Sequence, residues 1–226
     1  MPFIQIPESP LAPHQQDLEL YYREAGSGLP PLFLHGGWGY EIYPFDKQRA
    51  AFDNDFRILI PDRSGYGRSP RLTSMSADFH NHAAVEMLRF LEAMNLERVF
   101  LWGHSDGAVI ATKMALLAPE RFFGIILEAF HYYRVKPASR EFFETMMNDP
   151  TQLGERVTEI LAAAHGADYW HRLIQINGTA WLQIADQSLH EKADLYDGQI
   201  AKLKTPVVFL HGKQDPRTEP DELHKV

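Results

Sequence analysis

The sequence predicts an α/β protein with an open, mostly parallel sheet and helices on both faces. Three observations lead to this prediction. Short, continuous apolar runs recur along the chain, and such runs suit parallel strands that are covered on both faces. Segments with a helical spacing of apolar residues separate these runs. One run ends in a glycine-flanked serine, Ser105, that opens a helical segment.

The expected strands follow one another with turn signals between them. Residues 7–16 are polar and proline-rich, and we expect a surface strand-to-loop segment there. Residues 18–23 alternate in polarity, which is typical of a half-exposed strand. The remaining strand candidates are short apolar runs at residues 32–34, 56–60, 99–102, 124–127 and 207–210.

Helical segments separate these strands. Residues 77–94 carry apolar side chains at helical spacing, among them Met87 and Leu91. Residues 106–117 form a second candidate helix, which Pro119 stops. The alternation of strand and helix is what predicts the open parallel sheet.

The alternation stops after the sixth expected strand. We expect a helical cap over residues 132–203, inserted into a core formed by residues 1–131 and 204–226. The tripeptide at residues 148–150 (Asn-Asp-Pro) and the dipeptide at residues 177–178 (Asn-Gly) indicate turns inside the cap. The expected cap helices cover residues 139–147, 153–164, 168–176 and 191–203.

Composition excludes several classes of function. The net charge of −8 and the lack of a basic run argue against nucleic acid or an anionic membrane as a partner. The chain has no cysteine, no apolar stretch of membrane-spanning length and no signal-peptide pattern at its start, so we expect a cytoplasmic protein. No dinucleotide or phosphate-loop motif is present, and we expect no cofactor. His80 and His82 lie two positions apart and do not share a helix face, so we expect no metal site.

Ser105 has the sequence context of a catalytic nucleophile. It lies in the pattern Gly-x-Ser-x-Gly, directly after an apolar run and directly before a helical segment. A serine on such a sharp turn projects its oxygen from the top of a parallel sheet. Gly103 and Gly107 suit the turn because the strand and helix backbones approach too closely for side chains. The first amides of the helix then point toward the serine.

Three further motifs agree with this turn in order and spacing. They are His-Gly-Gly-Trp-Gly at residues 35–39, Asp-Arg-Ser-Gly-Tyr-Gly-Arg-Ser at residues 62–69 and His-Gly-Lys-Gln-Asp at residues 211–215. Together they span almost the whole chain, and the sequence resembles the α/β-hydrolase family. Within that family it is similar to the valacyclovirase-like (biphenyl hydrolase-like) esterases, through Asp106 after the nucleophile, the cap length and the cap aromatics around Tyr169.

The resemblance implies a catalytic triad with Ser105 as nucleophile and Asp215 as acid, and Glu128 is the competing acid. The family places the base histidine in a loop about 25 to 30 residues after the acid. We therefore expect the base, the last strand and the closing helix to lie beyond Val226, and an exposed apolar sheet edge without them.

Four histidines of this sequence have other expected positions or roles. His131 follows the sixth strand and could reach the pocket as a replacement base. We expect the His104 side chain to point away from the serine, His35 to be structural and His224 to be exposed on a helix.

The resemblance also indicates which residues hold the reacting group and the substrate. The backbone amides of Gly37 and Asp106 are expected to form the oxyanion hole. Trp38, Phe130 and His131 are expected to contact the substrate. The Asp106 carboxylate would attract a substrate ammonium group, as the matching aspartate does in valacyclovirase-like enzymes; otherwise it is a first-turn acid complementing the helix dipole.

The predicted activity is hydrolysis of small carboxylic esters through an acyl-enzyme, with α-amino acid esters as the class that Asp106 suggests. Carbon-carbon bond hydrolases, lactonases and perhydrolases would share these residues, and a non-catalytic ligand-binding relative is the alternative from another class. Dehalogenase and epoxide-hydrolase chemistry would need an aspartate in place of Ser105. The only partner predicted is a small-molecule substrate, and the oligomeric state is left open.

Overall fold

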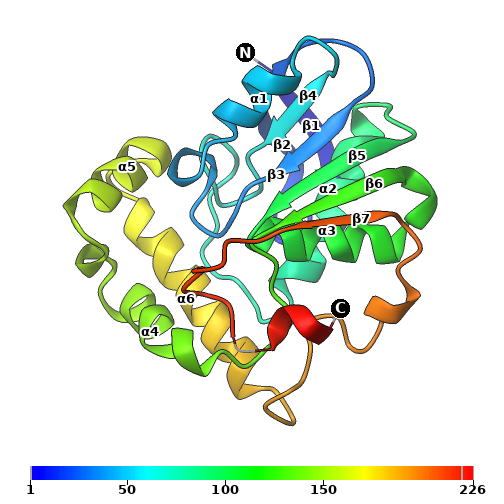
Figure 1. Ribbon diagram of the computed structural model, residues 1–226. Helices are drawn as coiled ribbons and strands as arrows, with labels where there is room; N and C mark the ends of the chain where they lie inside the picture. The colour runs from blue at the N-terminus through cyan, green and yellow to red at the C-terminus, as the bar shows by residue number, and fades with distance from the viewer. Residues whose placement is uncertain (1, 220, 226) are drawn as a thin grey trace.

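A computed structural model describes residues 2–219 and 221–225. Within these residues, seven strands form one sheet in the order β1-β2-β4-β3-β5-β6-β7 (Figure 1). The pairs β1–β2 and β2–β4 are antiparallel, and β4, β3, β5, β6 and β7 run parallel to one another, so the predicted mostly parallel sheet is confirmed. The strands are β1 (Phe3–Glu8), β2 (Gln16–Ala25), β3 (Pro31–Leu34), β4 (Ile58–Pro61), β5 (Val99–His104), β6 (Phe122–Glu128) and β7 (Val207–Leu210).

The burial of each strand follows its sequence pattern. All residues of β3 and β4 are buried, as their continuous apolar runs predict for strands covered on both faces. In β2, Leu18, Leu20 and Tyr22 are buried, while Glu19 is exposed and Tyr21 is half-buried, which fits the predicted half-exposed strand. β1 was not predicted as a full strand, and it pairs antiparallel with β2 along its length.

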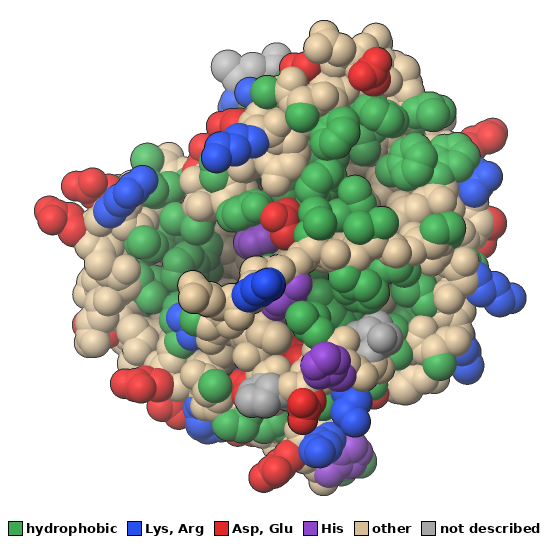
Figure 2. Space-filling view, in the orientation of Figure 1, with side chains coloured by type: hydrophobic (Ala, Val, Ile, Leu, Met, Phe, Trp, Pro, Cys, Tyr) green, Lys and Arg blue, Asp and Glu red, His purple; other side chains and the backbone are tan. Residues whose placement is uncertain are grey.

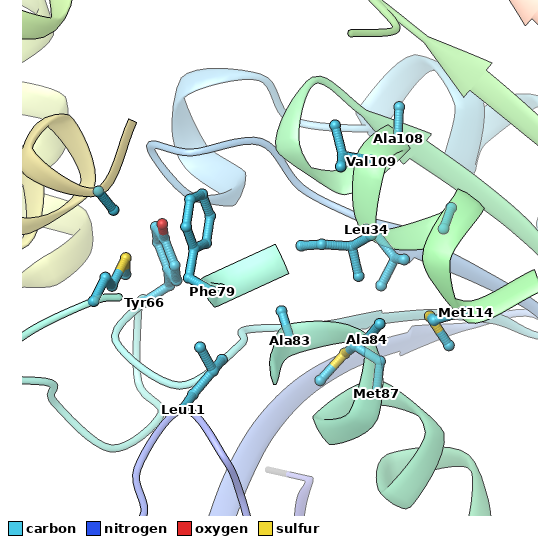
Figure 3. Packing of buried hydrophobic residues seen from close by; sticks show 14 of the residues in the cluster. Leu11, Leu34, Tyr66, Phe79, Ala83, Ala84, Met87, Ala108, Val109 and Met114 are labelled. Carbon is cyan, nitrogen blue, oxygen red and sulfur yellow. The ribbon is translucent and has the colours of Figure 1, made fainter. Parts of the chain in front are cut away.

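Two helices cover one face of the sheet. They are α2 (Phe79–Ala93) and α3 (Asp106–Leu117), and α3 packs against β3, β5 and β6. Figure 3 shows Met87 of α2, Met114 of α3 and Leu34 of β3 meeting in this core. The bounds predicted for α3 are those observed.

On the opposite face, an unpredicted helix, α1 (Asp46–Phe52), covers part of the sheet beside a small cluster around Phe33 and Phe45.

Three α-helices follow β6 and precede β7 in the chain, and they lie beside the sheet (Figure 1). We call them the cap helices. They are α4 (Arg140–Asn148), α5 (Glu155–His165) and α6 (Trp170–Asp186). The predicted turn at Asn177 and Gly178 is wrong, because α6 continues through both residues. Gly178 has a packing role there, since a Cβ at this position would lie 2.7 Å from the Cβ of Met146 on α4.

The predicted helix over residues 191–203 is also wrong. Only a short 3-10 turn, Ile200–Lys202, forms in this segment. The Asp194 carboxylate accepts hydrogen bonds from the backbone N–H groups of Tyr196 and Gly198, and Asp197 takes a positive φ of 54°. This side-chain-capped turn competes with the helix.

One region of the sheet keeps apolar side chains at the surface. On the edge strand β7, Val208, Phe209 and Leu210 are 54%, 41% and 41% exposed. Val208 lines a groove of about 380 Å³ that Phe100 and Trp102 of β5 also line. Figure 2 shows hydrophobic side chains gathered over this region of the sheet. Among the helices described, none is both long and apolar enough to cross a membrane.

Candidate active site

Ser105 lies on a strained turn between β5 and α3. Its φ of 53° and ψ of −120° are rarely adopted by residues with a side chain. The backbone is held there because the Ser105 N–H donates to the Glu128 carbonyl at 2.9 Å. Gly107 allows the turn, since a Cβ at this position would lie 2.0 Å from the carbonyl oxygen of Leu34. The geometry is that of the predicted strand-turn-helix.

Ser105 opens into a pocket of about 300 Å³ between the core and the cap. Five segments contribute to its wall: the turn around Ser105, the loop after β3, the segment after β6, the cap helices and the loop after β7. This places Ser105 at the carboxyl edge of the parallel strands, where open α/β sheets bind ligands. The residues of the wall that matter for the chemistry below are Gly37, Trp38, Ser105, Asp106, His131 and Arg217.

The turn at residues 35–39 packs directly against the turn that carries Ser105. A Cβ at Gly36 would lie 3.3 Å from the Cβ of Ser105, and one at Gly37 would lie 2.6 Å from Oδ2 of Asp106. In the described part of the chain, no acceptor takes a hydrogen bond from the backbone N–H of Gly37 or Asp106. Two backbone amides without an acceptor among the described residues therefore lie near the serine, and an oxyanion hole needs donors of this kind.

Arg63 holds this turn from behind. Its buried guanidinium donates to the carbonyl oxygens of His35 and Gly36, at 2.5 and 3.1 Å. The His35 ring is fully buried and its Nδ1–H donates to the Gly36 carbonyl at 2.8 Å, so His35 is structural as predicted. Burial, with the nearby Arg63 cation, lowers the pKa of His35 well below its usual value. Sequence reasoning used Arg63 only as part of a motif and missed this role.

The Asp106 carboxylate is buried against the cap. The Trp181 Nε1–H donates to Oδ1 at 3.1 Å, and the Asn177 Nδ2–H donates to Oδ2 at 3.3 Å. His80 Nε2 lies 3.4 Å from Oδ1 at poor hydrogen-bond geometry. Burial acts to raise the pKa of Asp106, but the interaction with His80, followed by that with the Arg63 cation, outweighs it, and the pKa falls to about 2. A permanent carboxylate thus joins α3 to α6 beside the nucleophile.

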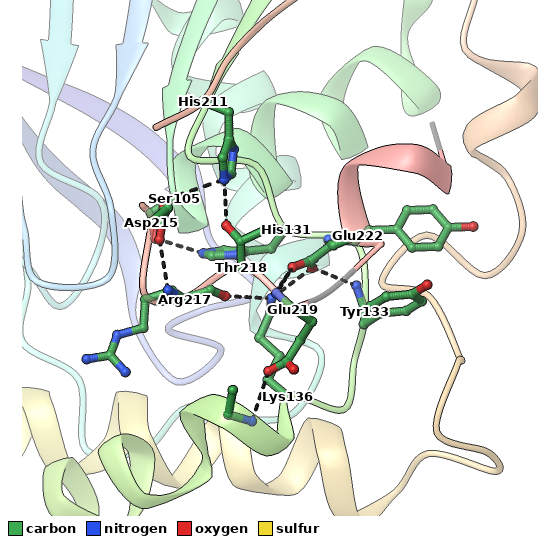
Figure 4. A network of polar contacts seen from close by, with 12 residues as sticks. Ser105, His131, Tyr133, Lys136, His211, Asp215, Arg217, Thr218, Glu219 and Glu222 are labelled. Carbon is green, nitrogen blue, oxygen red and sulfur yellow. Dashed lines mark hydrogen bonds and ion pairs between the residues drawn. The ribbon is translucent and has the colours of Figure 1, made fainter. Parts of the chain in front are cut away.

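His131 is the imidazole that contacts the nucleophile in the described chain. Its Nε2 lies 3.3 Å from Ser105 Oγ, and its Nδ1 is buried without a partner among the described residues (Figure 4). Burial, with the Lys136 cation, lowers the pKa of His131 well below its usual value, so the ring is neutral at pH 7. Its backbone is fixed because the Tyr196 hydroxyl donates to its carbonyl at 2.7 Å.

The two candidate acids differ in their surroundings. Asp215 follows β7 at the same sheet edge as Ser105, where it accepts the Arg217 N–H at 2.8 Å and lies 3.7 Å from His211 Nε2. Glu128 accepts the Tyr43 hydroxyl at 2.5 Å and the Trp102 indole N–H at 2.9 Å, which uses both of its oxygens. Neither carboxylate contacts His131 in the hydrogen bonds of the described residues.

Of the other predicted site residues, some line the pocket and some are buried in the core. Trp38 and His131 line the pocket as expected. Phe130 does not: it is fully buried and stacks on Tyr196, with ring centroids 5.6 Å apart, so the structure corrects its predicted substrate contact. The His104 ring stacks on the Tyr43 ring, with ring centroids 3.8 Å apart. His224 is exposed on a short 3-10 helix, Glu222–Lys225.

His165 at the end of α5 connects the cap to the loops around the site. Its Nδ1 accepts the Gly67 N–H at 2.9 Å, and its Nε2–H donates to the Trp38 carbonyl at 2.9 Å. Only a neutral imidazole can accept and donate in this way. Burial lowers the pKa of His165 and keeps this form. No local sequence signal predicts this contact, because its partners Gly67 and Trp38 lie 98 and 127 residues away in the chain.

No cluster of three or more His, Asp or Glu side chains that could hold a metal ion occurs within residues 2–219 and 221–225. His80 is buried beside Asp106, whereas His82 is half-buried on another side of α2. The groups that the described pocket offers for chemistry are the serine, the two amides, the imidazole and the nearby charges.

Comparison with known proteins agrees with this geometry. Residues 30–182 match the profile of the alpha/beta hydrolase fold family. The thermophilic esterase from Thermogutta terrifontis has a similar structure, with a TM-score of 0.71 and 19% sequence identity, over 100% of this chain and 85% of the esterase.

Two curated relatives are similar in sequence. Human serine hydrolase BPHL is 27% identical over 219 residues, which cover 92% of this chain and 72% of the relative. An epoxide hydrolase from Caballeronia sordidicola is 27% identical over 178 residues, which cover 73% of this chain and only 53% of the relative. The chain thus spans about half the length of the second relative.

Proposed function

The chain belongs to the alpha/beta hydrolase fold family, and within that family we propose that it is a serine hydrolase of small carboxylic esters. The observation that carries the proposal is the position of Ser105. Its strained turn opens into a pocket of about 300 Å³, a size suited to a small ligand. The backbone amides of Gly37 and Asp106 lie nearby and have no acceptor among the described residues.

The proposed reaction has two steps. Ser105 Oγ attacks the ester carbonyl carbon while an imidazole accepts the hydroxyl proton. The carbonyl oxygen becomes an oxyanion that the N–H groups of Gly37 and Asp106 stabilise. The carbon–oxygen bond to the alcohol then breaks, the proton passes to the leaving alcohol, and the acyl group stays on Ser105. A water molecule then attacks the acyl-enzyme in the same way and releases the acid and the free serine.

Two imidazoles are candidates for the base. The family resemblance implies a histidine that Asp215 orients, and this stays a prediction. His131 is within 3.3 Å of Ser105 Oγ, but its Nδ1 has no carboxylate partner in the described residues and burial makes it a weak base. We therefore propose that His131 orients the serine and the substrate instead of carrying the proton.

The α-amino acid esters predicted from Asp106 have less support than esters in general. Asp106 is only 2% exposed, and donors from the cap already occupy both of its oxygens. The ammonium role stays a prediction. It can be checked by comparing Asp106→Asn on aminoacyl and plain acyl esters, where an equal loss on both would contradict the role.

The test of the proposed function is the kinetics of p-nitrophenyl acetate and butyrate hydrolysis. We expect Ser105→Ala to lower kcat by at least about a thousandfold, because the nucleophile is lost. The matched control is Ser74→Ala, an exposed serine outside the pocket, which should keep the wild-type rate. Equal rates for wild-type protein and Ser105→Ala would contradict the proposal.

A further inference from the structure

Arg217 places a positive charge in the wall of the pocket that contains Ser105. Its guanidinium carbon lies 3.4 Å from the centre of the Phe142 ring, a close cation–π contact. The Phe142 ring in turn lies 5.4 Å from the ring of Trp38, which also lines the pocket. These three side chains form one continuous surface across the core and the cap.

The backbone of Arg217 is fixed on both sides. Its N–H donates to Asp215 Oδ1 at 2.8 Å, and its carbonyl accepts from Lys136 Nζ at 3.0 Å. Lys136 is anchored by Glu222 at 2.8 Å, and both side chains of this ion pair are at most 1% exposed. Figure 4 shows the guanidinium pointing away from this network. The fold therefore fixes the direction of the side chain without using its charge.

The guanidinium has no polar partner within residues 2–219 and 221–225, since no hydrogen bond or ion pair of these residues involves it. Burial lowers the pKa of Arg217 and nearby Asp215 partly offsets this, but an arginine stays charged at neutral pH. The pocket's other charge, Asp106, is buried and already paired with donors. His104 and His131 also line the pocket, and burial lowers the pKa of each, so both are neutral at pH 7.

We propose that Arg217 binds a free carboxylate on the substrate, so that the preferred substrates are small esters that also carry a carboxylate, such as hemi-esters of dicarboxylic acids. The inference rests on the proposed function and adds the substrate class. The planar guanidinium matches a carboxylate with two parallel hydrogen bonds. The aromatic surface of Trp38 and Phe142 strengthens the pairing because it excludes water around the ions.

The kinetic test compares monomethyl esters of dicarboxylic acids, from succinate to suberate, with methyl esters of monocarboxylic acids of the same chain length. We expect the wild-type kcat/KM to favour one or more hemi-esters. Arg217→Met keeps an unbranched chain against Phe142 but removes the charge, and it should lower the hemi-ester preference at least about tenfold. Arg140→Met, an exposed arginine on α4 outside the pocket, should keep the preference. An unchanged preference in Arg217→Met would overturn the proposal.

A binding test separates this inference from the proposed function. Monomethyl glutarate is titrated into Ser105→Ala protein by calorimetry, with and without Arg217→Met. The added substitution should weaken binding at least about tenfold if Arg217 holds the carboxylate. Equal affinities would overturn the inference even if the wild type hydrolyses esters. Arg217-dependent binding without Ser105-dependent hydrolysis would support the inference and contradict the proposed function.

Discussion

At the scale of single residues, the site combines a strained serine with donors and charges that the fold has already positioned. Ser105 keeps a φ of 53° because its N–H donates to the Glu128 carbonyl and because Gly103 and Gly107 allow the close approach of strand and helix at this turn. The sequence pattern predicted this turn because it is local. It could not predict that Trp181 and Asn177 hold Asp106, since these contacts depend on how the cap packs.

The role of His131 can be tested at this scale. We expect His131→Gln to lower kcat/KM about tenfold to a hundredfold, because the serine loses an orienting contact but not its base. The measurement is the kcat/KM of p-nitrophenyl butyrate hydrolysis, with exposed His190→Gln as the control. A loss as large as that of Ser105→Ala would show that His131 is the base and contradict the assignment.

At the scale of elements, the core was more predictable than the cap. The bounds of α3 followed from its apolar face and Pro119, and β3 from its continuous apolar run. The cap segment 191–203 looked helical by composition, but Asp194 caps a turn there. Asn177 and Gly178 carried a turn signal, but the close packing of α6 on α4 kept them helical.

The attachment of α5 to the site gives a prediction at this scale. His165→Phe leaves the Gly67 N–H and the Trp38 carbonyl without their partner, which we expect to cost about 1 to 3 kcal/mol in the free energy of unfolding. Urea unfolding measures this cost, and exposed His190→Phe is the control. A His165→Phe protein as stable as the control would contradict the bridging role.

The same contact should weaken in acid. The pKa of His165 in the folded protein lies below the ordinary pKa of histidine. The stabilising contact of His165 is therefore fully present when the pH is above the ordinary pKa, and it is lost as the pH falls through the folded pKa. Asp62 and Glu41 partly oppose the shift, and Arg71 and Asp168 lie beside the neighbouring Gly166. The stability difference between wild type and His165→Phe should therefore shrink as the pH decreases below about 6. A difference that is constant with pH would contradict this reasoning.

At the scale of the whole molecule, charged groups buried between layers connect the core to the segments packed on it. Lys113 on α3 is 7% exposed and donates to the Leu195 carbonyl at 2.6 Å in the segment after α6. The Lys136–Glu222 pair connects the start of the cap to the segment after β7. Such long-range pairings have no local sequence signal, so the sequence predicted the layers and not the contacts between them.

Lys113 makes stability depend on pH. Burial lowers the pKa of Lys113 to about 8, below its ordinary value, so the unfolded chain binds more protons above pH 8. The free energy of unfolding should therefore rise between about pH 8 and pH 9.5, by about 1 to 2 kcal/mol from this group. Lys113→Met should remove that part of the rise, measured by urea unfolding against wild type. The comparison with wild type is needed because burial also lowers the pKa of Lys136. If the free energy of unfolding rose equally with pH in both proteins, the prediction would be contradicted.

Covalent labelling tests whether Ser105 is the nucleophile. The protein is treated with a fluorophosphonate, and intact mass and peptide mapping locate the adduct. We expect a single adduct on Ser105, retained in Ser74→Ala and absent from Ser105→Ala. Equal labelling of wild type and Ser105→Ala, or an adduct mapped to another residue, would contradict it.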